Sequence, residues 1–114
     1  MRLLFLLALL LFIAGHTLAE EMQCSDAHAI RSVVPKYPLN ESPNPQTGYV
    51  VLSFKISDRG YVHSPKVIAS HAEPSEDWAK LFEEEAIKAI MQFHFRYRER
   101  ACIAEHKFEF MPKK

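Results

Sequence analysis

Apolar residues recur at every second position between Gly48 and Ile56, as they do in a strand with one buried face. The positions expected to face the core are Val50, Leu52, Phe54 and Ile56. Ser57–Gly60 then has the composition of a turn, and its glycine suits a left-handed backbone position. The pattern predicts a β-hairpin whose first strand is half-buried.

The returning strand, expected over Tyr61–Ser70, does not keep a single alternation. Its apolar positions change phase between Val62 and Val67. Pro65 lies between them and has no N–H group to donate to a ladder. We therefore expect a β-bulge or an unpaired edge at Pro65.

A long helix is expected after residue 73. Ser75 suits the N-cap, and Glu76 and Asp77 follow in the first turn, where the helix dipole favours acidic residues. One face collects apolar residues at helical spacing, namely Trp78, Leu81, Phe82, Ala86, Ala89, Ile90 and Phe93. On the polar face, Glu84 and Lys88 have the spacing of an ion pair.

A last strand is predicted over Cys102–Met111. Its inward positions are Ala104, His106, Phe108 and Phe110, and its outward positions are Glu105, Lys107 and Glu109. The order strand, strand, helix, strand predicts an α+β fold, a small three-stranded antiparallel sheet packed with one long helix.

The residues before the hairpin carry little periodicity. In the N-terminal segment, residues 20–34, Ser25 and Asp26 can cap a short helix, which must end before Pro35 because a proline disfavours helical geometry in the preceding residue. Residues 37–47 are rich in proline and asparagine and predict a loop. The folded domain is therefore expected over residues 35–114.

Residues 1–19 have the layout of a secretory signal peptide. Arg2 precedes the apolar run Leu3–Ala14, and Thr17 and Ala19 place small residues before Glu20. The run is short for a membrane span, so we expect cleavage and export. An uncleaved membrane anchor is the alternative, since the apolar stretch can be extended to Ala19.

The chain has two cysteines, Cys24 and Cys102. An exported protein meets an oxidising compartment, in which a pair of cysteines usually forms a disulfide. Two unpaired thiols are the alternative. We expect the bridge, which would close most of the domain into one loop.

Charge argues against a nucleic-acid partner. Removing residues 1–19 from the 114-residue chain leaves 95, enough for one small domain. Without Arg2 the 14 basic residues become 13, against 14 acidic ones. No net basic excess is left to neutralise phosphates, so we expect no nucleic acid to bind.

No catalytic or metal-binding pattern stands out. The histidines of the exported chain lack the short ligand spacings of zinc sites: they are His28, His63, His71, His94 and His106. No serine lies in a glycine-rich elbow, and the three glycines form no phosphate loop. We expect no cofactor, no metal and no enzyme activity. An enzyme or metal protein built on the histidines is the alternative.

Five short motifs follow one another between Pro35 and Phe110: Tyr37-Pro38, Gly48-Tyr49-Val50, Gly60-Tyr61-Val62, Val67-Ile68-Ala69-Ser70 and Phe93-His94-Phe95. In this order they resemble the C-terminal domain of TonB. The resemblance implies a periplasmic binding module with the fold predicted above. TonB's energy-harvesting parts are not matched, because Phe12 stands where that family has a serine before its histidine, and no long proline-rich spacer follows.

In TonB-like domains an extended receptor peptide adds to the last strand by backbone pairing. The resemblance therefore implies a binding edge along the last strand and a loop fixed beside it. The residues assigned to this site are Pro35, Tyr37, Pro38, Ile103, Glu105, Lys107, Phe108 and Phe110. The charged outward residues could instead guard the edge against aggregation.

The implied partner is a protein or peptide, such as a TonB-dependent outer-membrane receptor or another envelope protein. A homodimer through the edge strand is also open. The competing hypotheses are a structural or inhibitory envelope protein with the same fold, and an energy transducer anchored in the inner membrane if residues 1–19 are retained.

Overall fold

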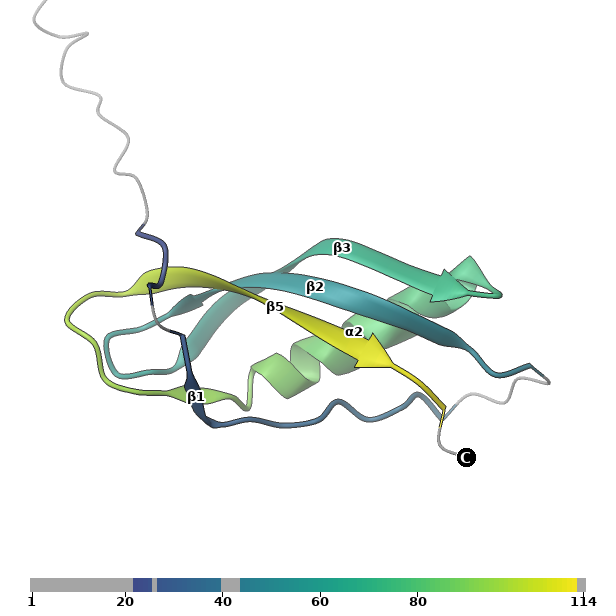
Figure 1. Cartoon of the computed structure of the whole chain (residues 1–114), viewed down its shortest axis with the longest axis horizontal. Helices are drawn as coiled ribbons and strands as arrows, with labels where there is room; N and C mark the ends of the chain where they lie inside the picture. The colour runs from purple at the N-terminus through teal and green to yellow at the C-terminus, as the bar shows by residue number, and fades with distance from the viewer. Residues whose placement is uncertain (1–21, 26, 40–43, 113–114) are drawn as a thin grey trace, which may run out of the picture.

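The structure is a computed structural model that describes residues 22–25, 27–39 and 44–112. The signal-peptide prediction falls on residues outside these ranges. Five strands and two helical segments follow one another (Figure 1): β1 Ala29–Arg31, β2 Thr47–Ile56, β3 Val62–Glu73, η1 Glu76–Trp78, α2 Ala79–Ile90, β4 His94–Phe95 and β5 Cys102–Phe110.

Strands β3, β2 and β5 form an antiparallel sheet in that order, with β2 in the centre. β2 pairs with β5 without a register shift, from Gly48 opposite Phe110 to Ile56 opposite Cys102. Helix α2 packs against one face of this sheet, and no helix of the described residues covers the other face (Figure 1). The predicted α+β architecture, three strands and one helix, is confirmed.

The core lies between the sheet and α2. It contains every apolar position predicted to face inward on β2, together with Phe82, Ala86, Ala89 and Ile90 of α2. The largest side chains with almost no exposed surface are Phe82, Leu52, Ile56, Ile90 and Val50. Trp78 and Ile87 are half-buried and pack against this cluster.

Strand β3 carries the irregularity that Pro65 predicts. Its register against β2 shifts twice, between Val51 and Leu52 and between Ser53 and Lys55. Ser64, next to the proline, has a positive φ of 52°. The second shift lies opposite Ser64 and Pro65, so the predicted bulge is confirmed.

The helix starts differently from the prediction. A turn of 3₁₀ helix precedes α2, and the Ser75 side chain caps neither segment. The Ser75 N–H instead donates to Oε1 of the buried Gln46 at 3.0 Å. Lys88 pairs with Glu85 at 3.4 Å, and not with Glu84 as predicted, because the i,i+3 neighbour is the one its ammonium reaches.

The expected helix near Ser25 is wrong. The structure has strand β1 instead, which pairs with β4 to form a second, two-stranded sheet. Phe95 of β4 is buried, and its N–H donates to the Gly60 carbonyl at 2.9 Å. A Cβ on Gly60 would lie 2.0 Å from the Phe95 carbonyl oxygen, and φ at Gly60 is +91°, so glycine is required here. Tertiary pairing with β4 thus overrides a weak local helix signal.

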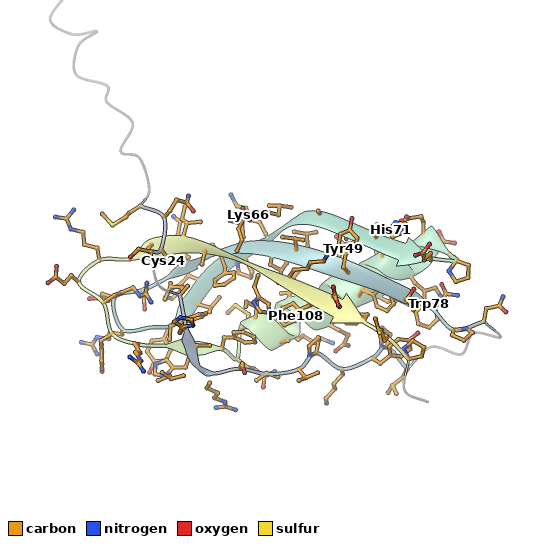
Figure 2. All side chains as sticks on the ribbon, viewed as in Figure 1. Cys24, Tyr49, Lys66, His71, Trp78 and Phe108 are labelled. Carbon is orange, nitrogen blue, oxygen red and sulfur yellow. A yellow bond between two sulfur atoms is a disulfide. The ribbon has the colours of Figure 1, made fainter. Side chains whose placement is uncertain are left out.

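Cys24 and Cys102 form the expected disulfide, which joins residues 78 apart in the chain. Beside it, the Ile103 N–H donates to the Met22 carbonyl and the Cys24 N–H donates to the Ile103 carbonyl, both at 2.8 Å. The segment Met22–Cys24 therefore lies alongside the first residues of β5, where Figure 2 places Cys24.

Replacing both cysteines by alanine is expected to lower the free energy of unfolding by about 4 kcal/mol, because a loop of this length restricts the unfolded chain strongly. Urea unfolding of the oxidised wild type and of the double variant measures the difference. Reduced wild type should unfold at the midpoint of the variant, and equal midpoints for all three proteins would contradict the expectation.

Candidate functional site

The outer edge of β5 is the feature with the clearest binding chemistry. In an antiparallel ladder the N–H and C=O groups of alternate residues point to opposite sides of the strand. Ile103 directs both of its groups away from β2, towards Met22 and Cys24. Because β5 has no register shift, Glu105, Lys107 and Glu109 direct theirs the same way.

Beyond Ile103 this edge is open. β5 is the last strand of its sheet, and among the described residues no segment pairs with Glu105, Lys107 or Glu109 on the outer side. In the described part of the chain, Glu105, Lys107 and Glu109 therefore present unpaired backbone donors and acceptors over a strand length of about five residues. Ile103, which belongs to the predicted site, is already paired with the Met22–Cys24 segment.

The side chains of the edge residues lie on the helix-free face of the sheet. The Lys107 ammonium sits 4.7 Å from the centre of the Tyr49 ring, a cation–π distance. It also lies 3.8 Å from a Glu109 carboxylate oxygen. Glu105, Lys107 and Glu109 are exposed, as the alternation predicted.

Phe108 and Phe110 point the other way, into the core. Phe110 stacks on Phe82 with ring centres 4.5 Å apart, and Phe108 packs edge-on against Phe93 at 5.8 Å. Both are almost fully buried. Phe110 therefore packs β5 on α2, and Phe108 packs it on Phe93, which follows α2; only their neighbours face outwards.

Tyr37 fixes the segment that precedes the hairpin. Its hydroxyl donates to the Gln46 carbonyl at 2.8 Å, and the Gln46 N–H donates back to the hydroxyl at 3.3 Å. Its ring contacts Trp78 and Phe82, with centres 5.9 Å apart in each case. Gln46 is itself 3% exposed, and its side chain accepts the hydrogen bond from the Ser75 N–H. Through Gln46, Tyr37 therefore connects its own loop with the hairpin and with the start of the helix.

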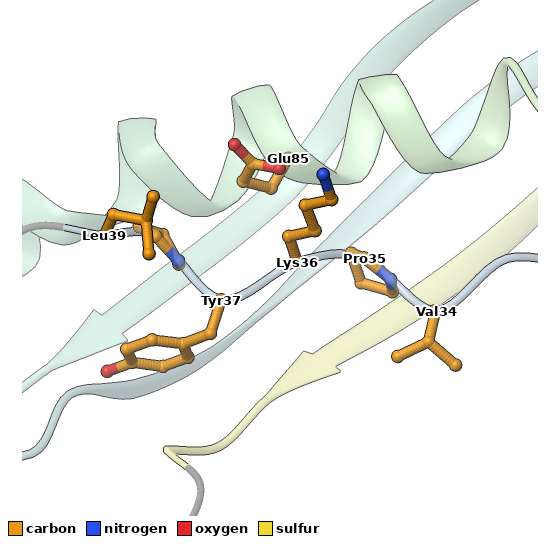
Figure 3. Close-up of a pocket in the computed structure, with 7 residues that line it drawn as sticks. Val34, Pro35, Lys36, Tyr37, Leu39 and Glu85 are labelled. Atoms are coloured by element: carbon orange, nitrogen blue, oxygen red, sulfur yellow. The ribbon is translucent and has the colours of Figure 1, made fainter.

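Pro35 and Tyr37 lie in an extended stretch beside α2 (Figure 3), and Pro38 follows Tyr37 in the chain. Pro38 is buried, whereas Val34 is 87% exposed and Leu39 fully exposed. This stretch and Glu85 of α2 line an open groove of about 600 Å³. All three predicted loop residues line this groove, and Tyr37 also fixes the loop through its hydroxyl and ring contacts.

His106 has a lowered pKa. It lies on the inner side of β5, with ring centres 4.5 Å from Phe108 and 5.3 Å from Phe93. Burial among these rings lowers the pKa of His106 below its usual value near 6.5, because the charged form loses its hydration. The sequence placed His106 on the inner face but gave no sign of this environment.

Two contributors to the site were not predicted. The pairing of Met22–Cys24 with Ile103 follows a disulfide between residues far apart, and no local pattern signals it. Gln46 sits in a proline-rich loop that offers no periodicity. Among the described residues, no three His, Cys, Asp or Glu side chains gather to hold a metal ion. No described helix has the length and apolar character to cross a membrane.

The fold and the site together define a small α+β domain whose regular β5 edge is open among the described residues, a class suited to binding extended protein segments. The model of the family described as Gram-negative bacterial TonB protein C-terminal matches residues 33–111, and the chain belongs to this family. Among solved structures, the chain is similar to the solution NMR structure of the Pseudomonas aeruginosa TonB C-terminal domain, with 26% identity and a TM-score of 0.62, over 80% of this chain and 91% of that one. The search of curated proteins found no match.

Family membership supports a periplasmic location and a protein partner for this chain, because TonB C-terminal domains of Gram-negative bacteria are periplasmic and bind other proteins. The resemblance inferred from the short motifs is confirmed. The match begins at residue 33, so β1 and the Met22–Cys24 segment lie before the part that the family shares.

Tyr37→Phe is expected to lower the free energy of unfolding by about 1 kcal/mol, because it removes a hydroxyl that bonds the buried Gln46 backbone and keeps the ring contacts. Tyr61→Phe is the matched control, since Tyr61 is 58% exposed, and it should change stability little. Urea unfolding measures both, and equal losses would show that the hydroxyl contact is not special.

The free energy of unfolding is expected to fall as the pH drops below about 6.5, because the unfolded chain binds a proton at His106 more readily than the folded one. The loss should continue down to the lowered pKa of the folded state and then level off. His106→Gln removes this titration while the carboxylates stay the same. Stability curves of wild type and variant that run parallel between pH 7.5 and 5 would contradict this assignment.

Proposed function

We propose that this protein is a periplasmic binding module that takes up an extended peptide by strand addition on β5. The partner is a segment of an outer-membrane transporter or of another envelope protein. The single observation that carries the proposal is the open row of outward backbone groups at Glu105, Lys107 and Glu109. The proposal gives the protein no catalytic role.

The opposite edge of the sheet is much less suited to the same task. β3 is interrupted by two register shifts, and it contains Pro65 and the left-handed Ser64. Bulges and prolines are the devices by which edge strands avoid pairing with other chains. β5 has a regular register throughout, so an added strand would find its ladder only there.

A bound peptide would form backbone hydrogen bonds with β5 and would bury little apolar surface. Glu105, Lys107 and Glu109 alternate in charge on the open face, so a bound strand with complementary charges would be favoured over an apolar one. On the other side of the sheet, Phe110 packs against α2 and Phe108 against Phe93, which keeps β5 fixed in the core. A rigid edge loses little conformational freedom on binding, which favours affinity.

A structural or inhibitory role with the same fold is the second candidate. It is favoured by the Met22–Cys24 segment, which already covers β5 at Ile103 and is held there by the disulfide. If a second copy of the chain covered the remaining edge in the same way, the site would be closed to peptides. The peptide titration below separates this case, because a closed edge would show no response.

Lys107→Pro is expected to weaken peptide binding about tenfold or more. The substitution removes an N–H group that points away from β2. The hydrogen bonds between β2 and β5 stay complete, since the Lys107 N–H does not donate to β2. One backbone hydrogen bond is lost and its acceptor on the peptide is left unpaired. The probe is a synthetic peptide from the periplasm-facing part of an outer-membrane transporter, titrated into the labelled protein by NMR.

Lys107→Ala is the matched control, since it removes the same charge and keeps the N–H. It should bind within a few-fold of wild type. Amide shifts in the wild type should concentrate on residues 104–110. Equal binding by the proline and alanine variants, or shifts confined to another surface, would rule out strand addition at β5.

A further inference from the structure

All five arginines among the described residues lie at one end of the molecule. Arg31 ends β1, Arg59 lies in the β2–β3 turn, and Arg96, Arg98 and Arg100 follow β4. Figure 1 shows these segments meeting at the end of the sheet where β5 begins. We call this group, with the neighbouring Tyr61 and Tyr97, the arginine tip.

Backbone contacts fix the tip, although its parts are distant in sequence. The Arg98 N–H donates to the Asp58 carbonyl at 2.9 Å. A His94 ring nitrogen lies 3.2 Å from the Arg59 carbonyl, and the His94 and Tyr61 rings are 5.0 Å apart. His94 is also opposite Arg31 in the β1–β4 pair. The three segments that carry the arginines are therefore held together by contacts to one another.

Except for Arg98, which is half-buried, the side chains of the tip face solvent. Arg31, Arg59, Arg96 and Arg100 are exposed, and no ion pair between described residues involves any of these four. Tyr97 is 82% exposed and Tyr61 58%. The described acidic residues at this end are Asp58 and Glu99, so the tip has an excess of positive charge.

Acidic residues collect at the opposite end of the sheet. Glu73 pairs in register with Thr47 and Glu109 with Tyr49, and Glu76 and Asp77 follow β3. The ten residues of β2 separate the two ends by roughly 30 Å. This is several times the Debye length of about 8 Å at physiological ionic strength, so the acidic end does not cancel the field of the tip. The formal net charge of zero for the whole chain therefore does not reveal that basic and acidic residues are separated between the two ends of the sheet.

We propose that the arginine tip docks on an anionic phospholipid surface. Guanidinium groups bind phosphate through paired N–H donors, and tyrosine rings favour the boundary between headgroups and acyl chains. The chain also enters the fold here: Met22 bonds Ile103 beside Arg98 and Arg100, and the apolar run Leu3–Ala14 precedes it in sequence.

The lipid contact and peptide uptake use different parts of β5. The tip surrounds its first residue, Cys102, whereas the open edge begins at Glu105. A domain held at its tip would keep the acidic end and the peptide edge away from the membrane. Either activity can therefore fail in an experiment without the other.

The test is sedimentation of the exported protein, purified with its disulfide intact, with vesicles of phosphatidylcholine alone or mixed with phosphatidylglycerol. Binding is expected only to the mixed vesicles, and it should weaken as salt rises. Replacing Arg59, Arg96 and Arg100 by glutamine should lower the affinity about a hundredfold, since each arginine near an anionic surface contributes to binding. Arg98 is left in place because it donates to the Cys102 sulfur.

The matched control replaces Lys36, Lys80 and Lys88 by glutamine, which changes the net charge equally and leaves the tip intact. It should bind like wild type. Thermal unfolding checks that both triple variants fold. If the arginine triple variant does not fold, the single substitution Arg100→Glu replaces it in the vesicle experiment. Equal losses in the two triple variants, no preference for phosphatidylglycerol, or binding of an acidic peptide without binding of vesicles would each overturn the proposal.

Discussion

The structure depends first on how Phe82 packs. It is fully buried, stacks on Phe110 of β5, and contacts Tyr37 and Trp78 at ring distances near 6 Å. A Cβ on Gly48 would lie 3.0 Å from this ring and 2.1 Å from the His71 carbonyl, so β2 comes this close to β3 and α2 only with glycine there. One helix residue thus sets the spacing of the helix, two strands and the Tyr37 segment.

That packing determines which edge of the sheet is available. Because Phe108 and Phe110 are held in the core, β5 keeps a regular register and turns its alternate backbone groups outwards. The same constraint does not apply to β3, whose bulges end regular pairing on its side. The regular register of β5 and the irregular register of β3 make β5 the edge better suited to pairing with another strand.

Local patterns predicted the hairpin, the bulge at Pro65, the long helix, the last strand and the disulfide, because each rests on alternation, helical spacing or the compartment of export. The helix near Ser25 and the Glu84–Lys88 pair were predicted wrongly. In the first case a weak capping signal competed with pairing to β4, and in the second the Lys88 ammonium pairs with Glu85, three residues before it, in place of Glu84. The predicted disulfide placed Cys24 beside Cys102, but the backbone pairing of Met22 and Cys24 with Ile103 could not be predicted, since no periodicity in that segment signals a strand.

The sequence by itself determined the fold class, the inward and outward faces of β2 and β5, and the family to which the chain belongs. Side-chain periodicity carries this information, because burial on one face is a local property of a strand or helix. Only the tertiary structure decided how much of β5 is open, and that Arg31 and Arg59 join the arginines after β4. Both depend on contacts between segments that are far apart in the chain. Spacing along the sequence does not encode such contacts, so the tertiary fold, and not any one motif, positions these backbone groups and arginines.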